Sequence, residues 1–238
     1  MKRKATSEKQ RGGGRPGAYR TKDGTIVPGT TTITGRFKNA GALVRWAFNC
    51  GRDGIDMDSR KKDAGSSGSI AHDMIEARIH GLEPSPPSPF ELGMRDGPEY
   101  QDIVQKATLC LEAFDRWQTQ SNAEFIVTEQ PYVSECYRFG GTIDAIGVVS
   151  GKYALIDFKT SARIYSDMLV QMGAYLQLWE EFNPDKPLAE VHLLRFGKED
   201  AGFHHHSWQR PTLEMGRKAF LLMRELYDLD KPLEKAVG

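Results

Sequence analysis

The 238-residue chain is short of cysteine, of long apolar runs and of net charge, and each shortage excludes a class of protein. Cys50, Cys110 and Cys136 are odd in number and far apart, so they predict neither a disulfide framework nor a zinc or iron–sulfur site. No apolar stretch approaches the roughly 20 residues that span a bilayer, and the start lacks the apolar segment of a secretory signal. We therefore expect a cytoplasmic protein with reduced thiols and no membrane partner.

The charges balance overall but not locally. The chain has 32 basic and 32 acidic residues, so it is not a polycation that would bind nucleic acid along its whole length. Residues 1–22, in contrast, hold eight basic side chains and the single acid Glu8. Residues 1–18 combine this charge with a run of three glycines and predict a flexible basic tail, because they can bury too little apolar surface to fold. Residues 19–238 then predict one domain.

The first half of that domain, residues 19–121, predicts a mainly helical part. The β-branched cluster Thr30–Thr34 favours an extended strand or loop that leads into a helix over 40–50. Further helices are expected over 66–80 and over 100–119, where apolar residues recur every three or four positions. The segment 83–89 between them is rich in proline and serine and predicts a loop.

The second half, residues 122–238, predicts a sheet with covering helices. The apolar period becomes strand-like, with strands expected over 125–128, 132–138, 141–149, 153–158, 190–196 and 203–208. A helix over 167–182 and a closing helix over 211–227 complete the pattern. This order predicts an α+β fold with a central mixed β-sheet flanked by helices, preceded by the N-terminal helical part.

Asp144, Asp157 and Lys159 stand inside predicted strands that are otherwise apolar. If Ser150 and Gly151 form a two-residue hairpin turn, counting outwards from the turn places Asp144 opposite Asp157. Lys159, two residues further on, shares the face of Asp157. Two carboxylates this close repel each other unless a proton or a cation intervenes, and a hard divalent ion with oxygen ligands is one solution. The same residues could instead form a structural ion cluster, and their spacing alone leaves both readings open.

A longer pattern resembles a known family. The carboxylate and lysine spacing, with a later glutamine–tyrosine pair, resembles the Asp…(Asp/Glu)-x-Lys and Gln-x-x-x-Tyr signature of RecB-like nucleases in the PD-(D/E)XK superfamily. The residues that carry it are Asp144, Asp157-Phe158-Lys159, Gln171 and Tyr175. The segment 68–76 looks like the helix that brings a histidine to the metal in that group, and 23–33 is similar to the opening of phage and mitochondrial genome maintenance exonucleases. The resemblance covers about residues 19–179 and implies a restriction-endonuclease-like fold.

The resemblance also implies a function and a role for each residue. It implies Mg²⁺- or Mn²⁺-dependent hydrolysis of DNA phosphodiesters by an exonuclease of replication, recombination or repair, with host-cytoplasmic location if a phage encodes it. The implied metal ligands are His72, Asp144, Asp157 and the backbone carbonyl of Phe158. Lys159 would be the catalytic lysine and Glu129 an accessory catalytic acid. Gln171 and Tyr175, one turn apart on a helix, would support the site and contact DNA.

The basic residues Lys38, Arg60, Lys61 and Lys62 are further candidates for phosphate contacts, the last three in an expected solvated loop. The tract His204–His206 is not expected to chelate metal, because neighbouring side chains in a strand point to opposite faces. No iron–sulfur cluster is expected, and no phosphate-binding helicase loop is present. Single- or double-stranded DNA with ends is the expected partner, with replication or recombination proteins as possible others. The alternatives are a structure-specific endonuclease and a non-catalytic DNA-binding module of the same fold.

Overall fold

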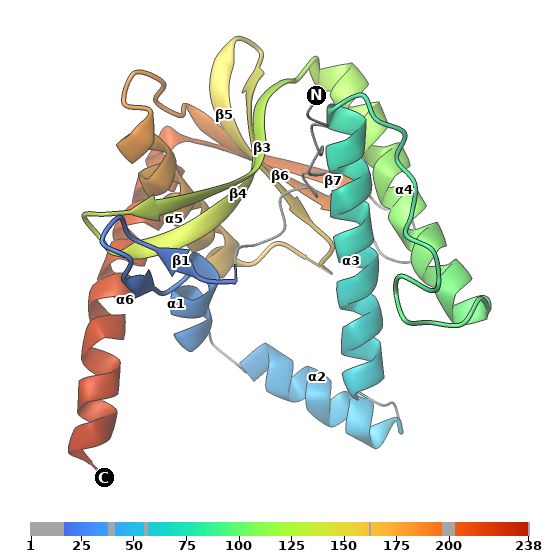
Figure 1. Cartoon of the computed structure of the whole chain (residues 1–238), viewed down its shortest axis with the longest axis horizontal. Coiled ribbons are helices and arrows are strands. Elements are labelled where there is room, and N and C mark those ends of the chain that lie inside the picture. The colour runs from blue at the N-terminus through green and yellow to red at the C-terminus, as the bar shows by residue number, and fades with distance from the viewer. Residues whose placement is uncertain (1–16, 38–40, 55–56, 162, 197–202, 238) are drawn as a thin grey trace, which may run out of the picture.

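The computed structural model describes residues 17–37, 41–54, 57–161, 163–196 and 203–237, without the side chains of 42, 43, 46, 57–66 and 231. Its centre is a mixed sheet of five strands in the order β3-β4-β5-β6-β7 (Figure 1). The strands are β3 (Glu124–Ser134), β4 (Phe139–Val149), β5 (Lys152–Lys159), β6 (Glu190–Phe196) and β7 (Phe203–Gln209). Only the pair β5–β6 in this sheet is parallel, since a helix crosses over between these two strands.

Helices cover both faces of the sheet (Figure 1). Helices α3 (Met57–Ile79) and α4 (Pro98–Ser121) pack on one face, and α1 (Thr30–Arg36), α5 (Ser166–Phe182) and α6 (Arg210–Ala236) pack on the other. Helix α2 (Gly41–Arg52) precedes α3, and a small hairpin of β1 (Tyr19–Arg20) and β2 (Ile26–Val27) precedes α1. The α+β fold with a central mixed sheet and flanking helices is therefore confirmed. None of the helices described between residues 17 and 237 is long and apolar enough to cross a bilayer.

The β4–β5 hairpin has the predicted turn and register. Ser150 and Gly151 have φ values of 49° and 79°, and a two-residue turn of the type that matches strand twist needs positive φ at both positions. The ladder pairs Val149 with Lys152 and continues to Ala145 with Ile156. Every side chain of β5 is thereby assigned to a face, which places Leu155 and Asp157 towards α5 and Ile156 towards α4.

The helices of the structure differ from the predicted elements at three places. The Thr30–Thr34 cluster is helical in α1, not extended, because burial of Ile33 and a hydrogen bond from the Thr30 hydroxyl to the Gly140 carbonyl outweigh the β-propensity of threonine. The run Arg60–Lys62 lies within α3, not in a loop, since α3 begins at Met57. Helix α6 likewise continues beyond Tyr227 to Ala236.

The two strands predicted over 125–128 and 132–138 are one strand, β3, which ends at Ser134. The strand tolerates Pro131 because β3 is an edge strand, where the missing N–H of proline removes no hydrogen bond from an inner ladder. A register shift between Phe125 and Val127 and a positive φ at Glu129 accommodate the change of direction along the strand. The register shift and the positive φ therefore lie within strand β3, where the sequence predicts two strands joined by a loop.

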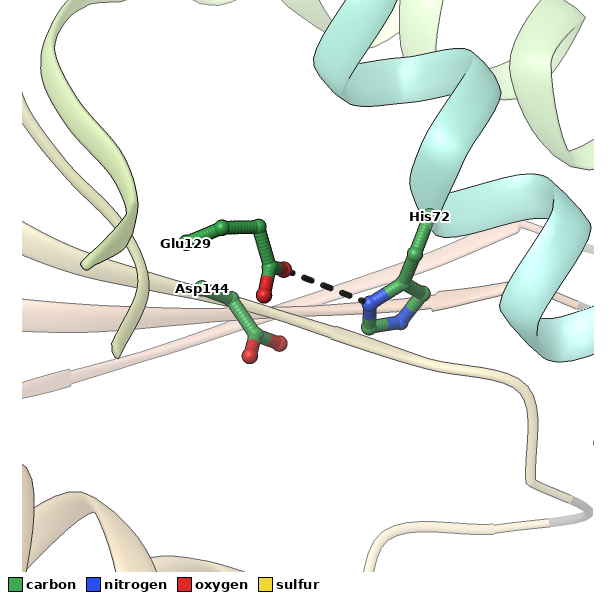
Figure 2. Close-up of side chains that lie close together, drawn as sticks. All are labelled: His72, Glu129 and Asp144. Carbon is green, nitrogen blue, oxygen red and sulfur yellow. Dashed lines mark ion pairs between the residues drawn. The ribbon is translucent and has the colours of Figure 1, made fainter. Parts of the chain in front are cut away.

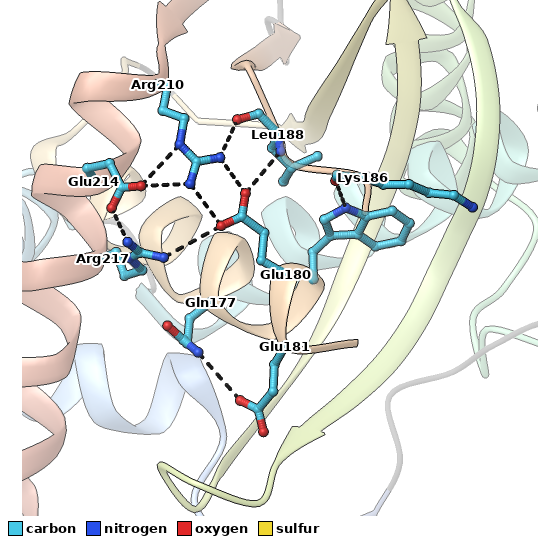
Figure 3. A network of polar contacts seen from close by, with 9 residues as sticks. Gln177, Glu180, Glu181, Lys186, Leu188, Arg210, Glu214 and Arg217 are labelled. Carbon is cyan, nitrogen blue, oxygen red and sulfur yellow. Dashed lines mark hydrogen bonds and ion pairs between the residues drawn. The ribbon is translucent and has the colours of Figure 1, made fainter. Parts of the chain in front are cut away.

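A network of charged groups fixes β6 against α5 and α6 (Figure 3). Arg210 Nη2 donates to Glu180 Oε2 over 2.9 Å, and Arg210 Nη1 donates to the Leu188 carbonyl over 2.8 Å. The Leu188 N–H in turn donates to Glu180 Oε1 over 3.1 Å, and Arg217 lies 3.5 Å from the same carboxylate. The network joins the start of α6, the end of α5 and the residues that lead into β6, so the crossover is held at the end where it enters β6.

Helices α5 and α6 approach each other through glycine. A Cβ added to Gly173 would lie 2.0 Å from the backbone nitrogen of Arg217, and one added to Gly216 would lie 2.3 Å from the Leu169 carbonyl oxygen. We expect Gly173→Ala to lower the free energy of unfolding by about 3 kcal/mol, because backbone atoms cannot move aside as a flexible side chain can. Urea unfolding measures this, with Gly35→Ala in α1 as the control, since a Cβ there meets nothing within 4 Å. Equal stability of the two variants would contradict the packing.

Candidate metal centre

Strands β4 and β5 separate just beyond the pair Ala145–Ile156, and Asp144 lies at the point of separation. Its carboxylate oxygen Oδ2 accepts a hydrogen bond from the Phe158 N–H over 3.1 Å. A side-chain acceptor thus satisfies a backbone group of β5 where the ladder between the strands ends. Asp144 is 8% exposed, which leaves the rest of its carboxylate buried in a fork between two strands.

Glu129 reaches the same fork from β3. The register pairs Thr128 with Ala145 and Gln130 with Ile143, so Glu129 lies across from Asp144. Its φ of 43° is unusual for a residue with a side chain, and such backbone strain costs about 1–3 kcal/mol and is concentrated at functional sites. The strained backbone and the position of Glu129 across from Asp144 together motivate the hypothesis that this carboxylate has a functional role.

His72 reaches the fork from helix α3, where it contacts Phe158 of β5. Gly68, one turn earlier in α3, is buried beside Thr160, the residue that follows β5. A Cβ added to Gly68 would lie 2.6 Å from Thr160 Oγ1. This close approach lets His72 Nε2 donate to the Phe158 carbonyl over 3.1 Å. Its Nδ1 lies 3.8 Å from Glu129 Oε1 (Figure 2). Burial opposes a charge on His72, but Glu129 and Asp144 outweigh it and raise the pKa of the imidazole above its ordinary value.

His72, Glu129 and Asp144 therefore converge (Figure 2). One ligand atom from each lies within 4.8 Å of the others, and no second such group of histidine, cysteine or acidic residues occurs in the described ranges. Carboxylate oxygens with one imidazole nitrogen suit Mg²⁺ or Mn²⁺. The Phe158 carbonyl, which the His72 ring contacts, faces the same fork. These ligand atoms fit a divalent cation better than a structural ion cluster. Two carboxylates lie side by side beside a single imidazole, and a cation between them would relieve their mutual repulsion.

Asp157 is the most unusual acid of the chain. It is 0% exposed, pairs in register with the apolar Leu193, and neither carboxylate oxygen has a hydrogen-bond partner. Lys159 Nζ lies 2.5 Å from Oδ2 in an ion pair. Burial raises the pKa of Asp157 to about 7, against the opposing effect of Lys159. The buried carboxylate thus has the Lys159 ammonium as a positive partner, and a cation in the fork would supply a second.

The predicted ligand set is thus only partly assembled. His72, Asp144 and the Phe158 carbonyl lie together, and Glu129 joins them as a possible ligand, although its predicted role was that of an accessory acid. Asp157 is in contact with Lys159 and is not among the three converging side chains. The roles of all these residues in binding and catalysis stay predictions.

The predicted DNA-contacting residues have different outcomes. Gln171 Nε2 donates to the Tyr175 hydroxyl over 2.7 Å, so the pair shares one face of α5 as its spacing predicts. Lys38 lies outside the described residues, and so do the side chains of Arg60, Lys61 and Lys62. Their proposed phosphate contacts stay predictions.

Sequence reasoning missed two residues that build the site. Gly68 was given only a place in the predicted helix, yet its lack of a side chain lets α3 approach Thr160. Arg195 was given no role, yet it pairs in register with Lys159 on the neighbouring strand. The only signal available for Arg195 was its place in an apolar predicted strand, the same signal that identified Asp144 and Asp157.

The strain at Glu129 gives a testable expectation. Glu129→Gly should raise the free energy of unfolding of the metal-free protein by about 1 kcal/mol, because glycine adopts positive φ without strain. Glu129→Gln is the matched variant, since it removes the same charge and keeps the strained backbone. Chemical unfolding in a chelator compares the two. A glycine variant no more stable than the glutamine variant would show that the backbone at 129 is relaxed.

The mixed sheet with its flanking helices and the converging acids fit a metal-dependent nuclease. The family description PD-(D/E)XK nuclease superfamily matches residues 44–226, and the chain belongs to this superfamily. A search of curated protein sequences found no match.

Solved structures with a related arrangement include two exonucleases. An alkaline exonuclease from Laribacter hongkongensis is 15% identical, with 60% of this chain and 88% of that chain covered and a TM-score of 0.32. The same enzyme in complex with dAMP aligns over 73% of this chain and 92% of its own, at 15% identity and a TM-score of 0.35. A phage-related exonuclease from Haemophilus somnus is 14% identical, covers 71% and 83% of the two chains, and has a TM-score of 0.36.

Proposed function

We propose that this nuclease is an exonuclease that hydrolyses DNA phosphodiesters with Mg²⁺ or Mn²⁺. The observation that carries the proposal is the convergence of His72, Glu129 and Asp144 in the fork between β4 and β5, with the Asp157–Lys159 pair on the adjoining strand. The preference for cleavage from ends rests on the likeness of residues 23–33 to the opening of phage and mitochondrial genome maintenance exonucleases. A role in replication, recombination or repair is part of the same proposal.

The ligands proposed for the cation are His72, Asp144, Asp157, the Phe158 carbonyl and Glu129. A bound divalent cation would neutralise a phosphate oxygen and lower the pKa of a coordinated water. His72 Nδ1 faces Glu129 while Nε2 donates to the Phe158 carbonyl, so in the imidazolium the proton on Nδ1 would have to leave before this nitrogen could act as a ligand. Cation binding is therefore expected to weaken as the pH falls and His72 is held in its protonated form.

Lys159 has a separate proposed task. Its side chain is 19% exposed, and its ammonium lies 2.5 Å from the buried Asp157 carboxylate. From there it can orient the attacking water by a hydrogen bond and stabilise the negative charge that develops on the phosphate oxygens. Gln171 and Tyr175 are proposed to fix the strand that contains the scissile phosphate, since their side chains bond to each other and share one face of α5.

Digestion of end-labelled DNA tests the proposal. Linear single- and double-stranded DNA and a circular single-stranded control are incubated with Mg²⁺, with Mn²⁺ and with a chelator. Exonuclease action predicts metal-dependent loss of the linear substrates and an intact circle. Cleavage of the circle would favour the endonuclease alternative, and DNA binding without products at any metal concentration would favour a non-catalytic module.

A further inference from the structure

Strand β7 carries a ladder of flat rings on one face, formed by His204, His206 and Trp208. The centroids of the two imidazoles are 6.5 Å apart with their planes at 16°, and those of His206 and Trp208 are 5.8 Å apart at 14°. His204 and His206 are exposed and Trp208 is half-buried against the core. His205, on the other face, stacks on His192 instead. The alternating pattern thus places two nearly parallel, exposed imidazole rings at the edge of the sheet.

The strand register connects this ring ladder with the metal centre. Lys159 of β5 pairs with Arg195 of β6, and Arg195 pairs with His204 of β7. Residues paired in this way point to the same face, and neighbouring strands lie about 4.8 Å apart, so the row from Lys159 to His204 spans about 10 Å. A nucleic acid strand bound at Lys159 would therefore pass over Arg195 and reach the ring ladder within a few nucleotides.

Arg195 is suited to hold the backbone of such a strand. Its Nη1 donates to the Ser161 carbonyl over 2.9 Å, which fixes the guanidinium in one orientation at the end of the sheet. A guanidinium carries five N–H donors, so a phosphate can be bound beside this carbonyl contact. Arg195 is paired in register with Lys159 on one side and His204 on the other, and neither of these partners is an acid. This row of side chains therefore attracts a polyanion.

We propose that Arg195 and the ring ladder form a binding track for unpaired nucleotides adjacent to the scissile phosphate. Arg195 contacts a backbone phosphate, while His204 and His206 stack on base faces. Stacking on a flat ring requires a base that is not already paired and stacked in a duplex, so the track assigns single-stranded DNA to this part of the substrate. The proposal rests on the proposed function and adds the strandedness of the substrate and the residues that read it.

Base stacking is tested with abasic DNA. Fluorescence anisotropy in a chelator compares a labelled single-stranded thymidine oligonucleotide with the same oligonucleotide carrying abasic sites. The natural protein should bind the intact oligonucleotide about tenfold more tightly, because stacking on aromatic side chains is worth about 1–3 kcal/mol per base. The double variant His204→Ala/His206→Ala should lose most of this preference. The double variant His204→Phe/His206→Phe, which keeps flat rings, should retain it, and so should Ser207→Ala on the opposite face.

The phosphate contact is tested by salt. Arg195→Gln should reduce the slope of log affinity against log salt concentration by about one, whereas Ser207→Ala should leave the slope unchanged. Cleavage of linear DNA in Mg²⁺ is measured in parallel. If the natural protein cleaves DNA but does not distinguish intact from abasic strands, or if the alanine variant distinguishes them equally well, the track is refuted while the nuclease function stands. If the natural protein cleaves no DNA with any divalent cation, the proposed function itself fails.

Discussion

Asp157→Asn is expected to abolish DNA cleavage and at the same time to stabilise the metal-free protein. Asparagine has nearly the same shape but carries no negative charge, so cleavage should fall about 10³-fold or more as the fork loses a charged partner for the cation. Stability should rise because the natural carboxylate is fully buried without a hydrogen-bond partner. The expected gain at neutral pH is on the order of 3 kcal/mol in the free energy of unfolding.

The stabilising effect should depend on pH in a defined direction. Burial raises the pKa of Asp157 from 3.8 to about 7 in the folded protein, so the folded state binds the proton more tightly than the unfolded state. Stability that this group contributes is complete at acid pH and is lost as the pH rises from about 4 towards about 7. Asp157→Asn should therefore match the natural protein at pH 4 and exceed it from pH 7 upwards.

Urea unfolding in a chelator at several pH values measures this difference. Asp185→Asn, a change at an exposed acid, is the control and should shift neither stability nor cleavage. Saturating Mg²⁺ should raise the free energy of unfolding of the natural protein, and should raise that of the asparagine variant less. An asparagine variant that is less stable than the natural protein at neutral pH would mean that the Lys159 contact outweighs the burial of Asp157.

Lys159→Ala is expected to lower the rate of DNA cleavage about 10²–10³-fold, the usual effect of removing one positioned donor at a developing negative charge. The Mg²⁺ concentration for half-maximal activity should change much less, because Lys159 contacts the carboxylate of Asp157 and supplies no ligand of its own. Single-turnover rates across an Mg²⁺ titration separate these two effects. An unchanged rate would exclude Lys159 from the chemistry.

Lys152→Ala is the matched control for this lysine. Lys152 stands at the opposite end of the same strand, is 55% exposed on its side chain, and lies 3.8 Å from Glu190. Its loss removes an equal charge from β5 at a distance from the fork. If both variants lost activity to the same degree, the effect would reflect the total charge of the sheet rather than a positioned ammonium.

The sequence predicted the sheet well because its strongest signals are local. The Ser150-Gly151 turn fixes the β4–β5 register, and that register determines which face each acid occupies. It predicted the start of the domain less well, since α1 is stabilised by contacts with Gly140 and the core, which no pattern within residues 30–34 reveals. The division of the chain into a basic tail and one domain stays a prediction.

The site could be predicted as a set of residue types but not as an arrangement. Periodicity placed Asp144, Asp157 and Lys159 on neighbouring strands, and the resemblance added His72 and Glu129. Neither could show that Asp157 is sealed in the apolar layer while Glu129 stands beside Asp144, because this depends on where β4 and β5 separate and on one strained φ. Such features arise from the packing of α3 and β3 around the fork, and they carry no local sequence signature.

The irregular course of β3 has a further consequence for the behaviour of the protein in concentrated solution. An edge strand with free N–H and C=O groups can recruit a strand of another molecule and so start aggregation. Pro131 removes one donor from this edge, and the shifted register near Phe125 together with the left-handed backbone of Glu129 interrupts the regular spacing of the others. The same distortion that directs the Glu129 carboxylate into the fork thus makes the edge strand β3 a poor template for pairing with a strand of another molecule.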